Sequence, residues 1–164
     1  MGGAQFRPIL LNLDRVAAVR VLGLDVGSRT IGVAVSDELG MAAHGVTTLA
    51  RRGTVKDVVQ VQDLVKKYAA SKVIVGMPYE IDGTVGRRAE RVKVFYDALA
   101  AAGLSLDECD ERFSTVEATE TLLQANISRA KRKEVIDQMA AQVILQRWLD
   151  ARPPGLGGHE PLPV

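Results

Sequence analysis

Two runs of small apolar and β-branched residues stand close together near the start of the chain. Residues 19–27 form the first run and Thr30–Ser36 form the second. Between them, Gly27-Ser28-Arg29 has the composition of a tight turn. The two runs therefore predict a pair of antiparallel strands, so the fold must include a β-sheet that begins in this part of the chain.

The rest of the chain alternates between patterns typical of strands and patterns typical of helices. Short apolar runs predict strands over residues 43–50, 72–77 and 104–113, and helical spacing predicts helices over 55–70, 87–102 and 131–151. Ser114, with Glu117 three residues later, has the pattern of a capping box and predicts another helix start. Three antiparallel strands followed by a βαβαβ order predict an α/β fold, with a mixed five-stranded sheet and helices on both faces.

The length of 164 residues suits one domain with a full core. We expect a flexible leader over residues 1–17, a single domain over 18–152, and a disordered tail rich in Pro and Gly over 153–164. The one cysteine, Cys109, excludes an internal disulfide and a cysteine-rich metal site. No apolar run approaches the ~20 residues of a membrane span. Together with the absence of a signal-peptide pattern, this predicts a cytoplasmic protein with no membrane partner.

Asp25 lies inside the first predicted strand, among residues that are otherwise apolar. Because side chains alternate along a strand, Asp25 shares a face with Gly23 and Gly27, which leave space beside its carboxylate. A carboxylate in a buried strand lowers stability unless it is paired or binds a metal. The alternative is an aspartate near a strand end that accepts amide hydrogen bonds from the following turn.

Two further acids lie on predicted apolar faces. Glu111 lies on the apolar face of the last predicted strand, and a salt bridge to Arg112 or to another cation is its alternative explanation. Asp137 lies in the last predicted helix, in line with the apolar Ile144 and Trp148. A boundary position on a solvated face is the alternative for Asp137.

The three acids indicate more together than each does singly. We expect Asp25 and Glu111 on neighbouring strands, with Asp137 on a helix that packs against them. Three adjacent carboxylates repel one another and raise each other's pKa, and a divalent cation removes that conflict. Oxygen ligands favour Mg²⁺ or Mn²⁺, and a pair of such ions ~3.5–4 Å apart is an arrangement that hydrolyses phosphodiesters.

Four blocks of the sequence resemble, in the same order, the signature blocks of the YqgF/RuvX family: GLDVGSRTIGVAVSD, VGMPYEIDGTVGRRA, DERFSTVEA and the final D-x-x-AA-x-x-IL. These proteins are small bacterial relatives of the RuvC Holliday junction resolvases. The resemblance covers about residues 20–150 and implies an RNase H-like fold. It also implies a nuclease, a hydrolase acting on phosphodiester bonds, with Asp25, Glu111 and Asp137 as its catalytic, metal-binding residues.

Members of this family are described in two ways, and the resemblance implies both activities. One is maturation of the 5′ end of pre-16S rRNA in ribosome biogenesis, which we expect here. The alternative is resolution of Holliday junctions in DNA recombination and repair. Related resolvases carry a fourth acid near the last aspartate, where this chain has Gln138, Ala140 and Ala141. The site therefore depends on three acids, and both one ion and two ions stay open.

Basic residues flank the predicted acids, although the net charge is only +1, so nucleic-acid binding must depend on local patches. Arg129, Lys131, Arg132 and Lys133 lie at the start of the last predicted helix, Arg87 and Arg88 follow the loop 79–86, and Arg29 lies in the hairpin turn. Cations at a helix start oppose the helix dipole, and a bound phosphate reverses that effect. We expect these residues to form a substrate-binding rim, with ordinary solvated turns as the alternative.

Several hypotheses follow for the partner and for the function. Aromatic residues make up 4% of the chain, which favours contacts to nucleic-acid backbone and shape over base stacking. We expect structured RNA or single-stranded or branched DNA as the partner, and either a monomer or a homodimer. A non-catalytic RNA-binding module is a remote alternative. So is a sugar-kinase or actin-type ATPase, although 164 residues cannot supply the two domains that close around ATP.

Overall fold

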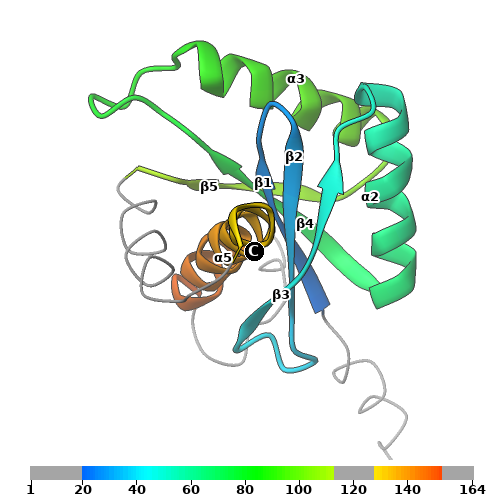
Figure 1. Ribbon diagram of the computed structural model, residues 1–164. Coiled ribbons are helices and arrows are strands. Elements are labelled where there is room, and N and C mark those ends of the chain that lie inside the picture. Colours follow the sequence, from blue (N-terminus) through cyan, green and yellow to red (C-terminus); the bar gives the residue numbers. More distant parts are fainter. Residues whose placement is uncertain (1–19, 113–127, 153–164) are drawn as a thin grey trace, which may run out of the picture.

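The computed structural model describes residues 20–112 and 128–152. Its elements are β1 (Arg20–Val26), β2 (Thr30–Ser36), β3 (Ala43–Ala50), α2 (Thr54–Tyr68), β4 (Ala70–Met77), α3 (Arg87–Ala101), β5 (Leu106–Asp110) and α5 (Arg129–Asp150). The five strands form one sheet in the order β3-β2-β1-β4-β5 (Figure 1). The first three strands are antiparallel, whereas β4 pairs parallel with both β1 and β5.

The first two strands in the sequence, β1 and β2, form an antiparallel hairpin, as the two apolar runs predict. Its register places Asp25 opposite Gly32. The backbone N–H of Gly27 donates to the carbonyl of Thr30 at 2.8 Å and closes the turn. The parallel pairs require crossover connections, and the helices α2 and α3 supply them.

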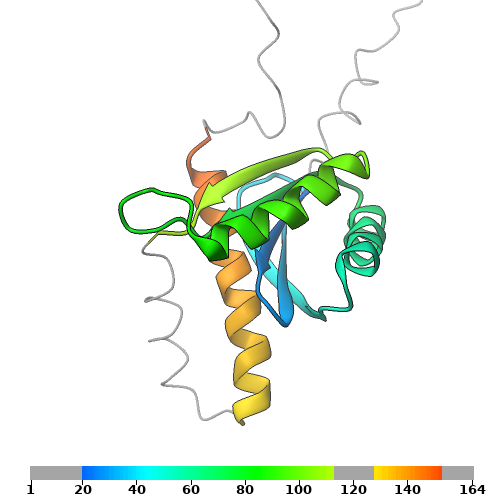
Figure 2. The same ribbon diagram turned by 90° about the horizontal axis from the view of Figure 1, so that it is seen from above.

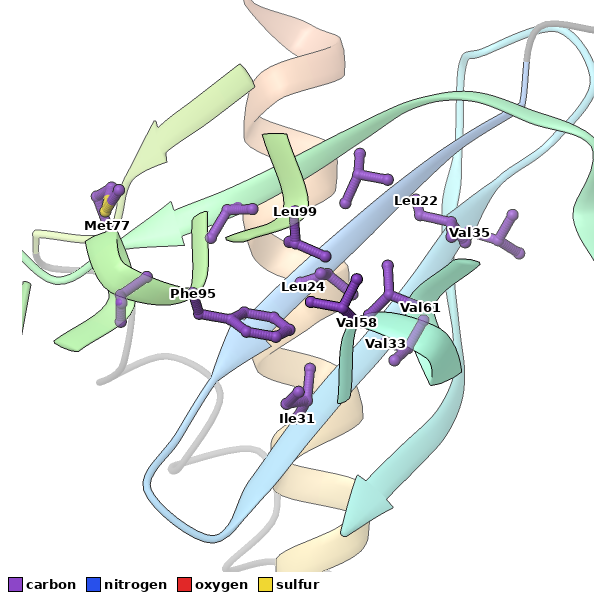
Figure 3. Close-up of a cluster of buried hydrophobic side chains, with 13 residues drawn as sticks. Leu22, Leu24, Ile31, Val33, Val35, Val58, Val61, Met77, Phe95 and Leu99 are labelled. Atoms are coloured by element: carbon purple, nitrogen blue, oxygen red, sulfur yellow. The ribbon is translucent and has the colours of Figure 1, made fainter. Parts of the chain in front are cut away.

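The sheet lies between two helical layers, which Figure 2 shows from above. Helices α2 and α3 cover one face, where Phe95 and Leu99 of α3 and Val61 of α2 pack on β1 and β2 (Figure 3). Helix α5 covers the other face, where Ile144 and Leu145 are buried against the sheet. Burying apolar surface on both faces is the main stabilising contribution, at about 25 cal/mol per Å². The predicted α/β architecture with helices on both faces is confirmed.

The structure departs from the predicted boundaries mainly at β5, which ends at Asp110 and not at residue 113. Asp110 accepts hydrogen bonds from the backbone N–H of Arg112 at 2.9 Å and from its Nε at 2.7 Å. A side chain that bonds backbone two residues later forms a turn, and this ends the strand. Glu111 therefore lies directly after β5, although its N–H still donates to the carbonyl of Met77 at 3.0 Å.

Some predictions lie outside the described residues. These are the leader 1–17, the tail 153–164, and the helix start at Ser114 with its capping box. Within the described part of the chain, no helix has the length and apolar character needed to cross a membrane.

Helix α5 approaches the sheet so closely that its backbone touches β2. A Cβ added at Gly32 would overlap the backbone carbonyl of Asp137, and backbone atoms cannot move aside as a flexible side chain can. The predicted role of Gly23 is wrong, because a Cβ there would lie 2.7 Å from Leu145 Cβ of the helix. The space beside Gly23 is filled by the helix, and the glycine serves packing.

We predict that Gly32→Ala lowers stability by forcing α5 away from β2. Overpacking of this kind typically costs about 1–3 kcal/mol, or roughly 2–12 °C in Tm for a chain of this size. Thermal unfolding followed by circular dichroism measures the change.

The matched control is Gly45→Ala on β3, which faces the same helix. The nearest atoms to an added Cβ there are Gln138 Cβ at 3.0 Å and the Gln138 carbonyl oxygen at 3.2 Å, so the overlap is much smaller than the one at Gly32. We expect a smaller fall in Tm for Gly45→Ala, and equal falls for the two variants would contradict this account of the contact.

Candidate active site

The three predicted acids come from one edge of the β1–β4–β5 part of the sheet and from the helix above it. Asp25 lies near the end of β1, Glu111 lies directly after β5, and Asp137 lies in α5. The expectation that Asp25 and Glu111 lie on neighbouring strands is wrong, because β4 runs between β1 and β5. Their side chains must therefore meet across β4.

Gly76 of β4 makes that meeting possible. A Cβ added at Gly76 would overlap Oε1 of Glu111 and would lie 2.6 Å from Cδ1 of Ile144. The Glu111 carboxyl therefore occupies the space that any other residue at position 76 would fill. From there it forms a side-chain hydrogen bond with Asp25.

The Asp25 and Glu111 side chains form a carboxyl pair that shares a proton. Burial, the nearby Asp25 carboxylate and the hydrogen bond to it raise the pKa of Glu111 to about 8. Burial also raises the pKa of Asp25, against the lowering effect of the hydrogen bond that it accepts from Glu111. The shared proton keeps the pair from carrying two adjacent buried charges. Such strongly shifted carboxyls are characteristic of functional sites.

Asp137 lies close enough to Asp25 for its charge to raise the Asp25 pKa further. Its carboxylate is held by Thr30 at the start of β2, whose Oγ1 donates to Asp137 Oδ2 at 2.7 Å. This contact joins residues that are 107 positions apart in the sequence. The apolar residues in line with Asp137, among them Ile144, are buried against the sheet as predicted. Asp137 therefore faces the sheet.

The predicted basic residues divide into two groups. Arg88, in the first turn of α3, lies near both members of the carboxyl pair, and its positive charge partly offsets the rise in their pKa values. The other predicted cations lie on several elements: Arg29 is exposed in the β1–β2 turn, Arg87 is exposed beside Arg88, and Arg129, Lys131, Arg132 and Lys133 lie in the first two turns of α5. Among the described residues, Arg88 is a predicted cation whose charge acts on both members of the carboxyl pair.

The salt bridge that Arg112 forms goes to another acid. Arg112 forms its salt bridge with Asp110, at 2.6 Å, while Glu111 turns toward Asp25.

Asp37, at the end of β2, accepts a hydrogen bond from the N–H of Met41 at 2.8 Å and has only a turn role.

Carboxylate oxygens are the ligands that Mg²⁺ and Mn²⁺ prefer. The Asp25–Glu111 pair supplies such oxygens from two strands, and Asp137 adds a third acid in electrostatic range. Over residues 20–112 and 128–152, however, no three His, Cys, Asp or Glu side chains are gathered tightly enough to hold a metal ion. The donor chemistry fits a divalent cation, whose positive charge would offset the repulsion between the carboxylates.

Sequence reasoning did not identify Thr30 or Gly76 as parts of this site. Both were assigned to strands on local composition, and nothing local shows what they face. Thr30 contacts Asp137 only because α5 crosses the hairpin there, and Gly76 matters only because β4 separates the two acids. The polar Thr30 directly after the turn was the one available signal.

Comparisons with known proteins place the chain among nucleic-acid enzymes. The family model RuvX, described as Holliday junction resolvase, matches residues 19–151. A protein of Myxococcus xanthus named "Putative pre-16S rRNA nuclease" is 49% identical over 143 residues, which cover 86% of this chain and 95% of the relative. A protein of Clostridium novyi with the same name is 47% identical over 134 residues, covering 81% of this chain and 99% of the relative.

Solved structures show the same fold at much lower sequence identity. RuvC of T. thermophilus, in complex with a Holliday junction substrate, is 12% identical with a TM-score of 0.52 and covers 81% of this chain and 94% of its own. The yeast mitochondrial Holliday junction resolvase Ydc2 is 14% identical with a TM-score of 0.51, covering 84% and 82%. These neighbours confirm the RNase H-like fold. By the family match and by its curated relatives, the chain belongs to the RuvX family of nucleases.

Proposed function

We propose that this nuclease hydrolyses phosphodiester bonds at the 5′ end of pre-16S rRNA, with a divalent cation held by Asp25, Glu111 and Asp137. The observation that carries the proposal is the half-buried Asp25–Glu111 carboxyl pair, which meets across Gly76 with Asp137 in electrostatic range. A pair of adjacent half-buried acids lowers stability, and a bound divalent cation would offset the repulsion between them.

Bound Mg²⁺ or Mn²⁺ would supply an activated water and stabilise the charge that develops on the leaving oxygen. The protein provides the rigid frame for this chemistry. The β1–β2 hairpin fixes Asp25, and the Thr30 hydroxyl orients the Asp137 carboxylate by its 2.7 Å hydrogen bond. Exposed Arg88 lies beside the pair, where it would bind a phosphate of the substrate.

The choice of RNA as substrate is supported by the curated relatives, which are named pre-16S rRNA nucleases at 42–49% identity. Such a role would place the enzyme in the cytoplasm. Branched DNA is the second candidate, because the matching family model is described as a Holliday junction resolvase. In either case the basic residues around the site would contact phosphates, so that shape and backbone decide binding more than sequence does.

The first test compares cleavage of a pre-16S 5′-leader RNA and of a four-way DNA junction in Mg²⁺ and in Mn²⁺. Asp25→Asn should lower the rate on the preferred substrate at least about 100-fold, because even the partners of metal ligands typically contribute 10–100-fold. Asp63→Asn, at an exposed position of α2, is the matched control and should cleave normally.

Two results would count against the proposal. Asp25→Asn with wild-type activity would exclude the assigned acids, and cleavage of the junction without cleavage of the RNA would favour the second candidate.

The shared proton predicts how metal affinity depends on pH. In the metal-free protein Glu111 is protonated below its pKa of about 8, so a cation must displace that proton. Calorimetric affinity for Mn²⁺ should therefore rise, by up to about tenfold per pH unit, as the pH approaches 8, and it should level off above this value.

The same shift predicts the stability of the metal-free protein. In the folded protein the pKa of Glu111 is about 8, against an ordinary value of 4.5. The folded state therefore keeps a proton that the unfolded state has already released, and the contribution of Glu111 to stability is lost as the pH rises through about 8. Glu111→Gln removes this group and should flatten the decline in Tm between about pH 5 and pH 8. An unchanged slope in this variant would show that Glu111 is not the buried proton carrier.

Arg88 should bind a substrate phosphate. In EDTA, where no cleavage occurs, Arg88→Gln should weaken RNA binding for all sequences alike and reduce the slope of log K against log salt by about one. Lys66→Gln, an exposed cation at the end of α2, is the charge-matched control. Equal slopes for the two variants would exclude a phosphate contact at Arg88.

A further inference from the structure

Asp57 is a fully buried carboxylate, 0% exposed, that lies outside the candidate active site in the first turn of α2. It accepts hydrogen bonds from Arg51 Nε at 2.7 Å, from the backbone N–H of Arg52 at 2.8 Å and from Gln60 Nε2 at 3.2 Å. A negative charge in the first turn also interacts favourably with the helix dipole. The carboxylate is thus fixed, and it fixes the Arg51 side chain in turn.

Arg51 reaches from Asp57 to the β1–β2 turn on the other side. Its Nη1 donates to the carbonyl of Gly27 at 2.9 Å, and its backbone N–H donates to the carbonyl of Arg29 at 2.8 Å. The guanidinium also lies 5.1 Å from the centre of the Phe95 ring. One side chain therefore connects the start of α2, the core under α3 and the turn of the hairpin.

This turn connects Asp25 with Thr30, the residue that binds Asp137, and so it links two of the three candidate metal ligands. Asp25 precedes Gly27 by two residues, and Thr30 directly follows the turn and holds Asp137 through its 2.7 Å hydrogen bond. A shift of the Gly27–Thr30 backbone would displace the end of β1 and the hydroxyl that orients Asp137. The distance between the two carboxylates therefore depends on this turn.

We infer that Arg51 is a positioning residue of the nuclease site: held by Asp57, it fixes the β1–β2 turn and thereby the spacing of Asp25 and Asp137. The inference rests on the proposed function, because the spacing matters only if these acids bind a cation. Stability alone does not explain the arrangement, since a buried ion pair is often no more stabilising than apolar residues of the same volume. Only a planar group with several separated donors can bond Asp57 and the Gly27 carbonyl at once.

The experiment replaces Arg51 by lysine. Removing the charge outright would leave Asp57 buried without its ion-pair partner and would endanger folding. In Arg51→Lys the ammonium still pairs with Asp57, but a compact point charge cannot also reach the Gly27 carbonyl as the fork does. Arg52→Lys is the matched control, because the neighbouring Arg52 contributes only its backbone N–H to Asp57 and has an exposed side chain.

Two measurements separate positioning from a purely structural role. Hydrogen exchange of the Gly27 amide, followed by NMR, reports on the turn, because this N–H bonds the Thr30 carbonyl. Calorimetry reports the affinity for Mn²⁺. For Arg51→Lys we expect about tenfold faster exchange at Gly27 and about tenfold weaker Mn²⁺ binding, as for other groups that orient metal ligands. RNA binding in EDTA should stay within about twofold of wild type, and Arg52→Lys should match wild type throughout.

The outcomes are distinct from those that test the proposed function. Wild-type exchange and wild-type Mn²⁺ affinity in Arg51→Lys would overturn the inference, and so would a lowered Tm with both of these unchanged. Wild-type protein that fails to bind Mn²⁺ would overturn the inference together with the metal site. If wild-type protein binds Mn²⁺ but does not cleave the RNA, only the substrate assignment fails, and the difference between the two lysine variants still supports positioning by Arg51.

Discussion

The hydrogen bond between Asp25 and Glu111 is the interaction on which the rest of the candidate site depends. It joins Asp25 of β1 with Glu111, which directly follows β5, and it needs Gly76 of β4, the strand between them, to have no side chain. A buried carboxyl pair is unfavourable for folding by itself. The surrounding sheet and helices must therefore supply enough apolar burial to keep the pair in place, and the two packed faces do so.

Most of the fold could be predicted from the sequence, because its signals are local. The β-branched runs on either side of Gly27-Ser28-Arg29 predict the hairpin, and β1 and β2 form it. Helical spacing likewise predicts α2, α3 and α5 to within about two residues at most ends. The three acids could be selected for a related reason, since each interrupts an apolar pattern whose period is visible in the sequence.

The contacts that make the site could not be predicted, because they join segments that are distant in the sequence. The position of β4 between β1 and β5, the crossing of α5 over Gly32, and the bond from Thr30 to Asp137 all depend on tertiary arrangement. The end of β5 was missed for a different reason. Asp110 bonds the backbone of Arg112, and this turn competes with the extended pattern of the strand.

The residues that break local rules lie around one small region. Gly32 and Gly76 interrupt strands that are otherwise rich in β-branched residues, and Asp25 and Glu111 place half-buried carboxyls beside them. Local sequence patterns and the overall fold normally disagree at functional or strained sites. The two carboxyls lower stability, whereas the two glycines provide the space in which a helix backbone and three acids come together at one end of the sheet. A side chain at position 32 would force the helix away from β2, and a side chain at position 76 would displace Glu111 from Asp25, so each glycine is required by the contact that it faces.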